Sequence, residues 1–553
     1  MLLSAAAVAQ TKPDSLDRLA SDFWTWRAKY RPFSTDDVPR MERPSGVRDW
    51  SASAIVQQRA DLGELERRWK EISTGDWPVA KRVDYRLIGS ALARVRWELD
   101  VNPRWQRDPT FYIEQTVVAL QEALLSPPPF GEDRSREIVE RAENIPAILE
   151  QARINLKPVA PFAQLAIDSL SDIDARLERV EHGVSPLLTS DDQRARLHAA
   201  MPKAARALID CREWLKKDLP HMRPDFALGA DAYGFFLHRV ALLPYTPEQL
   251  LTMARQDFDR VLAMEAYERQ RDIAAPALTL PATADEEVGR MVKADASTRK
   301  YLVDHEILSV PSDLPHWTMR AAPGYVAAFD GFGELDDFTG PSRLHQDGTR
   351  WLMPLAGELP YFSKAYAEDP RTTGVHEGVP GHFFQLSLSW RNPDPIRRQY
   401  YDSGANEGIG FYAEEMMLQA GLYDDSPRSR EIIYSFARLR ALRVEVDVKL
   451  ALGEFTIAQA ADYLARTVPM DRRTAEDEAA SFASAPGLAI AYEIGKLQIE
   501  RLLAERRLQL GDKFSLREFH DYVWSNGNVP LALQRWELAG LDDDVRKVDA
   551  AAK

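Results

Sequence analysis

Hydrophobic residues recur at intervals of three and four positions over most of this chain. In Ser15–Tyr30, Leu16, Leu19 and Phe23 fall on one side of a helix with 3.6 residues per turn. This spacing predicts an amphipathic helix that buries one face. The same pattern, interrupted by proline-rich breakers, predicts further helices over residues 54–72, 83–99, 109–125, 134–155, 161–184, 191–219, 246–273, 457–467, 473–481 and 488–510.

The pattern changes between about residues 274 and 372, where prolines and glycines are frequent. We expect a loop-rich stretch with a few short strands. An edge strand there could bind an extended peptide through main-chain hydrogen bonds. Five side chains of this stretch are candidates to line a substrate site, although each is more often a surface or loop-stabilising residue: His316, Arg320, Tyr325, Arg343 and His345.

Two of the ten histidines flank a short acid-containing segment, Val375-His376-Glu377-Gly378-Val379-Pro380-Gly381-His382-Phe383-Phe384. A buried carboxylate beside two imidazoles is costly unless a cation or hydrogen bonds satisfy these groups. Asn406-Glu407-Gly408 follows about two dozen residues later. A Glu that enters from a following helix completes the ligand set of a catalytic zinc site. The candidate metal ligands are therefore His376, His382 and Glu407.

The histidine spacing differs from the usual H-E-x-x-H signature, because Pro380 stands where the second His would be. Six residues turn an ideal helix through about 600°, which leaves the two rings about 120° apart. A bulge or kink at Pro380-Gly381 would be needed to bring His382 back toward His376. Alternatively, a helix ends at Pro380 and both histidines are hydrogen-bonded core residues.

Several segments resemble the bacterial domain-of-unknown-function 885 family. They are the H-E-x-x-P-G-H motif, Glu407-Gly408-Ile409-Gly410-Phe411-Tyr412-Ala413-Glu414, Ala485–Leu497 and, more weakly, Gly229–Val261. The resemblance covers about residues 229–500 and implies a helical, zincin-like metallopeptidase. Two departures occur. Ala451 stands where the family usually has a His, and Ile409-Gly410 replaces the usual Trp-Ala pair.

The residue types permit a specific mechanism. One zinc ion per chain would activate a water molecule, and manganese or cobalt could substitute for it. Glu377 would act as general base. Tyr492 would hydrogen-bond the developing oxyanion, although a core tyrosine is an equally good interpretation. Glu414 lies two turns beyond Glu407 and could accept a hydrogen bond from a ligand His, the alternative being an ordinary polar neighbour.

We therefore expect a zinc-dependent hydrolase, and first of all a metallopeptidase that acts on short peptides. The alternatives are a metal-dependent hydrolase or lyase that acts on another small amide or an ester, and a metal-free binding protein derived from such an enzyme. Fold analogy does not decide between them.

The length and net charge of the chain limit its possible architecture and its possible binding partners. The 553 residues exceed the usual size of a single core. We expect a mainly α protein with two helical lobes around a central cleft, and a short β element near the metal helix. The lobes are predicted at 11–228 and 229–553, the second carrying the metal site, in one continuous catalytic unit. The net charge of −15 argues against a nucleic-acid partner.

The first ten residues resemble the apolar end of a secretory signal, with Ala7-Val8-Ala9 as a small-x-small cleavage site. A positively charged start is missing, so residues 1–10 are expected to be a truncated signal-peptide remnant; an ordinary N-terminus is the alternative. The expected location is periplasmic or secreted, and otherwise cytoplasmic. The single Cys211 excludes an internal disulfide. No segment has the roughly 18 continuous apolar residues of a membrane span.

Overall fold

Helices make up most of the computed structural model, which describes residues 15–34, 42–44, 46, 48–271, 273–355 and 357–552. The predicted signal remnant at residues 1–10 lies outside the described residues. Within them, no helix combines the length and the apolarity that crossing a membrane requires. The mainly α class expected from the periodicity is confirmed. The division at residue 228 stays a prediction.

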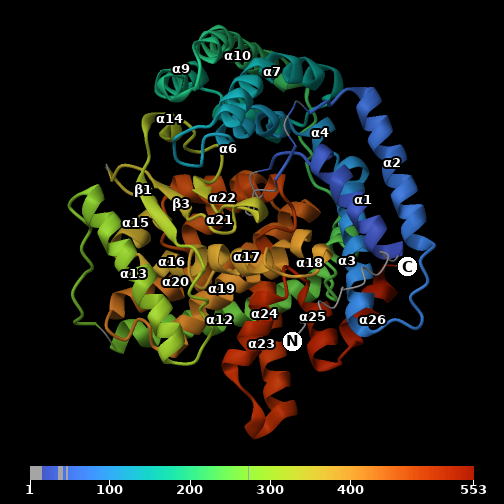
Figure 1. Ribbon diagram of the computed structural model, residues 1–553. Coiled ribbons are helices and arrows are strands. Elements are labelled where there is room, and N and C mark those ends of the chain that lie inside the picture. The colour runs from blue at the N-terminus through green and yellow to red at the C-terminus, as the bar shows by residue number, and fades with distance from the viewer. Residues whose placement is uncertain are drawn as a thin grey trace, which may run out of the picture.

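The N-terminal helices occupy the right and the top of the molecule in Figure 1. On the right lie α1 (Ser15–Tyr30), α2 (Ala52–Lys70) and α3 (Val79–Arg96). The top contains α4 (Arg104–Arg107), α5 (Thr110–Ile113), α6 (Ala119–Glu122), α7 (Glu132–Asn155), α8 (Ala160–Ser169), α9 (Ile173–Val184) and α10 (Asp191–Asp218). A π-helical segment at 114–118 interrupts the helix predicted over 109–125.

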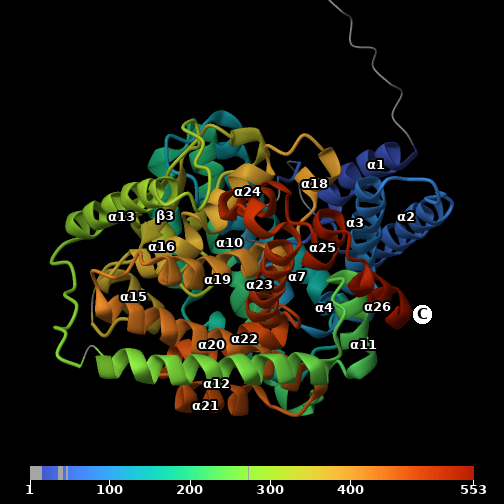
Figure 2. The ribbon, with the colours of Figure 1, turned by 90° about the horizontal axis from the view of Figure 1, so that it is seen from below.

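The remaining helices lie mainly in the centre and at the bottom, except that the short α14 lies near the top beside α9 in Figure 1, and the long α12 runs beneath α20 in Figure 2. They are α11 (Ala230–Phe235), α12 (Pro247–Arg271), α13 (Ala284–Asp304), α14 (Gly324–Ala327), α15 (Tyr361–Glu368), α16 (Arg371–Glu377), α17 (His382–Ser389), α18 (Pro395–Gln399), α19 (Ser403–Ala420), α20 (Pro427–Leu452), α21 (Ile457–Thr467), α22 (Arg472–Ser484), α23 (Ala489–Leu510), α24 (Leu516–Ser525), α25 (Leu531–Ala539) and α26 (Asp543–Ala551).

Two expectations from the sequence pattern were wrong. The helix predicted over 161–184 is broken between α8 and α9, where Ser171 and Asp172 offer side chains that compete with helical hydrogen bonds. The stretch 274–372 is not loop-rich throughout, because it contains the 21-residue α13. The Thr283 hydroxyl caps this helix by accepting from Glu286 N at 3.1 Å. The start of this helix was not predicted from the sequence because prolines flank it.

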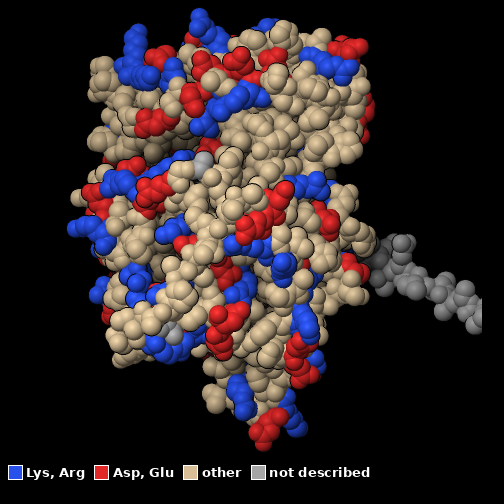
Figure 3. Space-filling model, turned by 90° about the vertical axis from the view of Figure 1, so that its left-hand side faces the viewer, with Lys and Arg blue, Asp and Glu red and all other residues tan. Residues whose placement is uncertain are grey.

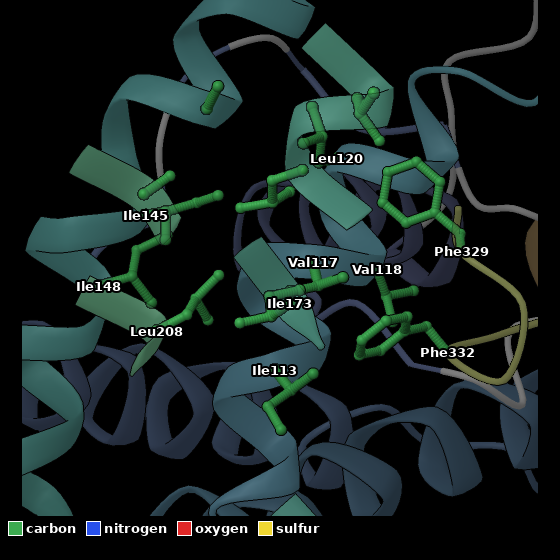
Figure 4. Packing of buried hydrophobic residues seen from close by; sticks show 14 of the residues in the cluster. Ile113, Val117, Val118, Leu120, Ile145, Ile148, Ile173, Leu208, Phe329 and Phe332 are labelled. Carbon is green, nitrogen blue, oxygen red and sulfur yellow. The ribbon is translucent and has the colours of Figure 1, made fainter. Parts of the chain in front are cut away.

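The largest core cluster joins the top helices to the loop that follows α14. Ile145 and Ile148 of α7 lie toward Leu208 of α10, and Phe329 and Phe332 from the loop complete the same cluster (Figure 4). The i, i+3 and i+4 spacing of these aliphatic residues on their helices produces the interface. The N-terminal helices are thereby fastened to the segment that leads into the histidine motif.

A small sheet lies against that motif. Strand β1 (Trp317–Ala321) pairs in parallel with β3 (Gly348–Leu352), and β2 (Asp336–Asp337) pairs antiparallel with β3, giving the order β1-β3-β2. A Cβ atom on Gly348 would lie 2.7 Å from the Phe383 ring of α17. The predicted short β element next to the histidine helix is therefore present.

Helices α19 and α23 approach each other through glycines. A Cβ atom on Gly495 would lie 2.2 Å from the carbonyl oxygen of Gly404 and 2.6 Å from Cα of Gly408. Real Cβ atoms do not tolerate such distances, so only glycine permits this contact. This close approach of the two backbones fixes where the residues of α19 and α23 lie relative to α16.

Helix α24 supports the same region through a buried histidine. His520 Nδ1 lies 2.7 Å from the Ile307 carbonyl oxygen and must therefore carry the proton, so that Nε2 accepts from the Tyr412 hydroxyl at 2.9 Å. Burial lowers the pKa of His520 to about 4, against a smaller opposing effect of the Ile307 carbonyl. The folded state therefore favours the neutral ring.

Gly495→Ala should destabilise the protein by about 2–3 kcal/mol, because the added methyl group overpacks the α19–α23 contact. Gly289→Ala is the matched control: it lies in α13 with no atom within 4 Å of the new Cβ, and should stabilise by about 0.5–1 kcal/mol. Urea unfolding measures both changes. Equal effects of the two substitutions would contradict the packing argument.

His520→Gln should remove part of the acid sensitivity of the fold. A base with a lowered pKa contributes stability that is intact above its ordinary value of about 6.5 and is lost as pH falls toward 4. At about 1.4 kcal/mol per pH unit, the wild type should lose about 3 kcal/mol more than the variant between pH 7 and 4. Denaturant unfolding across this range tests the difference, with the surface variant His221→Gln as control. Parallel profiles for wild type and His520→Gln would refute the assignment.

Candidate metal centre

A tight turn brings the two motif histidines together. Helix α16 ends at Glu377, and α17 begins at His382, with a cis peptide bond between Val379 and Pro380. The rings of His376 and His382 lie with centroids 4.6 Å apart and planes at 84°. The expected kink within one helix is thus a complete break, because proline lacks the N–H group and the residue before it avoids the helical region. The break comes at Glu377 rather than at Pro380.

Neighbouring groups hold this turn. A Cβ atom on Gly381 would lie 1.7 Å from the carbonyl oxygen of His376, so the chain can fold back this closely only with glycine. On the other side, the indole N–H of Trp524 donates to the Pro380 carbonyl oxygen at 2.6 Å. The position of His382 therefore depends on α24 as well as on its own helix.

Helix α19 brings Glu407 to the histidines. The Asp402 carboxylate caps this helix by accepting from Ala405 N at 3.2 Å. Glu407 Oε2 lies 3.1 Å from His382 Nε2 and 3.4 Å from His376 Nε2. One ligand atom from each of the three residues lies within 4.8 Å of the others, and all three side chains are buried.

These distances fit a metal ion. Tetrahedral zinc with nitrogen and oxygen ligands at 2.0–2.1 Å separates the ligand atoms by about 3.3 Å. Both imidazoles direct Nε2 toward the same carboxylate oxygen, which is the arrangement that a shared cation requires.

The charges in this group are strongly coupled. Burial opposes ionisation of Glu407, but His382 and His376 outweigh it and hold the pKa of Glu407 far below its usual range. Burial likewise opposes protonation of His376, yet Glu407 and Glu414 raise its pKa to about 9. The buried carboxylates thus require a positive charge at this point, which a proton or a bound divalent cation can provide.

Glu414 lies behind His376. Its Oε1 is 2.7 Å from His376 Nδ1, although the ring nitrogen does not meet the angle of a well-aligned hydrogen bond, and it is 3.3 Å from Arg440 Nη2. Burial raises the pKa of Glu414, and Arg440 and His376 more than reverse this effect. Glu414 therefore lies where an acceptor that orients a ligand histidine would be needed.

Glu377 is the carboxylate beside these three residues that has no bonded partner. It is half-buried and makes no hydrogen bond or ion pair with any residue that the structure describes. It lies near enough to His376 for its charge to raise the pKa of that ring. The charge of Glu377 also contributes to raising the pKa of Arg350, which pairs with Asp336 at 3.2 Å. The Glu377 carboxylate is thus not engaged by another described side chain.

Tyr492 of α23 covers the other side of His376. The two rings are nearly parallel at 16°, with centroids 5.9 Å apart. The guanidinium carbons of Arg443 and Arg440 lie 4.5 and 5.0 Å from the centre of the tyrosine ring. Burial, and then the charge of Glu407, raises the pKa of Tyr492 well above 10, so the phenol keeps its proton. These two arginines were not predicted from the sequence. The available signal was three arginines within the otherwise apolar stretch 436–444.

The five candidates from the preceding stretch make other contacts. His316 pairs with Asp295 at 2.8 Å and Arg343 with Asp337 at 2.7 Å. Tyr325 belongs to the N-terminal core, and Arg320 and His345 are exposed. None of these contacts reaches the group of His376, His382 and Glu407. These contacts and exposures match the alternative interpretation, in which the five are surface or loop-stabilising residues.

The two departures from the family pattern leave this group intact. A Cβ atom on Gly410 would lie 2.9–3.1 Å from the His376 ring, so glycine gives that ring room. Ala451 packs in an apolar cluster with Phe236 and Ile490, and its carbonyl oxygen accepts from the main chain at Leu228 and Gly229. The three candidate ligands thus meet without the missing histidine.

Two solved structures share this fold over almost the whole chain. A candidate lipoprotein of unknown function from Shewanella oneidensis is 20% identical, with a TM-score of 0.70 and coverage of 97% of this chain and 100% of its own. A candidate lipoprotein from Colwellia psychrerythraea is 18% identical, with a TM-score of 0.74 and coverage of 97% and 99%. No curated protein matches the sequence. The model of a family of bacterial proteins of unknown function, DUF885, matches residues 42–538, so the chain belongs to this family.

Proposed function

We propose that this protein is a zinc-dependent hydrolase, and specifically a metallopeptidase that acts on short peptides. The observation that carries the proposal is the meeting of His376, His382 and Glu407, whose candidate ligand atoms lie within 4.8 Å of one another in a buried position. Three protein ligands of this kind leave a fourth position open, as catalytic zinc sites do.

A zinc ion bound there would act as a Lewis acid and lower the pKa of water to about 7. The residues around it have complementary roles. Glu377, with no bonded partner, accepts the proton of the attacking water and transfers it to the leaving group. Tyr492 keeps its phenol proton and donates a hydrogen bond to the oxygen on which negative charge develops.

The surroundings favour a small substrate. The candidate ligands are buried, and the proposed arrangement is zincin-like, with two helical lobes around a cleft. An extended, short peptide can reach such a site more easily than a folded protein. We further propose an extracytoplasmic location, in line with the small-x-small sequence Ala7-Val8-Ala9 and with the two candidate lipoproteins of the same fold.

A lyase is the second candidate, because an unpaired Glu377 could also abstract a carbon-bound proton from a non-peptide substrate. The products separate the two reactions. Hydrolysis in ¹⁸O-labelled water incorporates the label into a product, whereas elimination does not.

Protein purified without added metal or a histidine tag should contain about one zinc per chain by elemental analysis. Glu407→Ala should lose the metal, because its carboxylate oxygen lies between both imidazoles. Glu414→Gln should retain it with about 10–100-fold lower affinity, as expected for a residue that orients a ligand. A wild type that holds no metal even after zinc is supplied would overturn the proposal in favour of a binding protein or a metal-independent enzyme.

Glu377→Gln should keep zinc while its peptide hydrolysis falls at least about 100-fold, because the amide cannot accept the proton. Activity toward a library of short peptides and the zinc content are measured on the same sample, so loss of metal and loss of the base are separated. Wild-type activity in this variant would show that Glu377 is not the base.

A further inference from the structure

A cavity of about 150 Å³ lies between the N-terminal helices and the beginnings of α19 and α23. Aromatic rings share its wall with charged and polar side chains. The aromatic side chains that line it include Trp24, Phe33, Trp97, Phe111 and Phe236. The space therefore suits a ligand that presents an apolar side chain together with a polar group.

The cavity lies one helical turn from the candidate metal centre along two separate helices. Ser403, which lines it, precedes Glu407 by four residues on α19. Leu488, which also lines it, precedes Tyr492 by four residues at the start of α23. Four residues rise about 6 Å along a helix. The segment 484–488, which includes the start of the third family-like stretch, forms part of the wall, so the same stretch carries both the wall and Tyr492.

Among the residues that the structure describes, one arginine of the cavity, Arg94, forms no ion pair with a carboxylate. Arg27 pairs with Glu98 at 2.6 Å, and Arg104 pairs with Glu114 at 2.9 Å. Arg94 instead packs on Phe236, with its guanidinium carbon 5.3 Å from the ring centre. Across the residues that the structure describes, no carboxylate forms an ion pair or hydrogen bond with Arg94.

One candidate counter-ion for Arg94 is already engaged in another contact. Asp402 lines a small adjoining pocket that also contains Arg94, but its carboxylate caps α19 through Ala405 N. Burial raises the pKa of Asp402 to about 7, although Arg94 lowers it. The carboxyl group is therefore only partly ionised at neutral pH. The guanidinium retains donors for an incoming anion.

We propose that this cavity binds the free carboxylate end of the substrate, with Arg94 as the anchor and the aromatic wall as the subsite for an apolar C-terminal side chain. This inference rests on the proposed function and names its substrate class: short peptides with a free carboxylate and an apolar last residue. The carboxylate accepts charge-assisted hydrogen bonds from Arg94. The chain of the peptide then runs along the starts of α19 and α23 toward Glu407.

The test uses N-acetylphenylalanine and its amide as probes, measured by calorimetric titration of the full-length protein as purified. The acid should bind at least about tenfold more tightly than the amide, because only the acid pairs with the guanidinium. Arg94→Gln should abolish this preference, and Arg94→Lys should retain part of it. Arg206→Gln, which removes the same charge on the exposed surface of α10, should leave it unchanged.

Two results would overturn the inference: equal binding of acid and amide by the wild type, or an undiminished preference in a folded Arg94→Gln variant. The comparison of the two probes on the wild type needs no variant, so a misfolded substitution does not obscure it. Glu407→Ala separates this inference from the proposed function. A preference that survives in this variant supports the Arg94 subsite even if no zinc is ever found. A preference lost in Glu407→Ala but kept in Arg94→Gln would assign the carboxylate to the metal and refute the subsite.

Discussion

The central constraint on this protein is the electrostatic cost of burying Glu407 together with His376 and His382. A carboxylate removed from water is expensive unless positive charge compensates it at short range. Here Glu407 Oε2 lies 3.1 and 3.4 Å from two imidazole nitrogens. The turn at Gly381, the Trp524 hydrogen bond and the capped helix α19 hold these atoms near one another. The same arrangement accounts for the fit of the group to a divalent ion.

Backbone proximity makes this arrangement attainable. The turn at Gly381 folds back onto the carbonyl of His376, and α19 meets α23 through Gly408 and Gly495 with almost no side chain between them. Both contacts exclude even a methyl group. The backbones that carry the candidate ligands and Tyr492 therefore pack directly against each other, without intervening side chains that could shift. Packing, rather than a regular helix, therefore positions the second histidine.

Charge compensation extends beyond the candidate ligands. On α23, Lys496 is fully buried and lies 2.6 Å from Asp257 and 3.1 Å from Glu415, the neighbour of Glu414 in the chain. Charges on the surface, by contrast, are mixed: blue and red side chains alternate over the face in Figure 3 without a continuous basic area. Buried charges are thus compensated by specific ion pairs, while charges on the exposed face are stabilised mainly by water.

Local periodicity determined a large part of the fold. Ser15–Tyr30 and Ile457–Thr467 are helices with the predicted bounds, because their apolar residues repeat at helical spacing. The residue types of the motif also pointed to His376, His382 and Glu407 before any geometry was known. The start of α13 escaped prediction, since nearby prolines masked a threonine cap.

Only the tertiary structure decided how the histidines meet and what surrounds them. On an ideal helix their rings diverge by about 120°, and whether a proline kinks or ends a helix depends on partners such as Trp524, far away in the sequence. Arg440 and Arg443 lie on the Tyr492 ring for the same reason. Spacing along the chain encodes which face of a helix a residue occupies. The partners of that face come from other helices, such as Trp524 at 144 residues from Pro380, and long-range packing selects them.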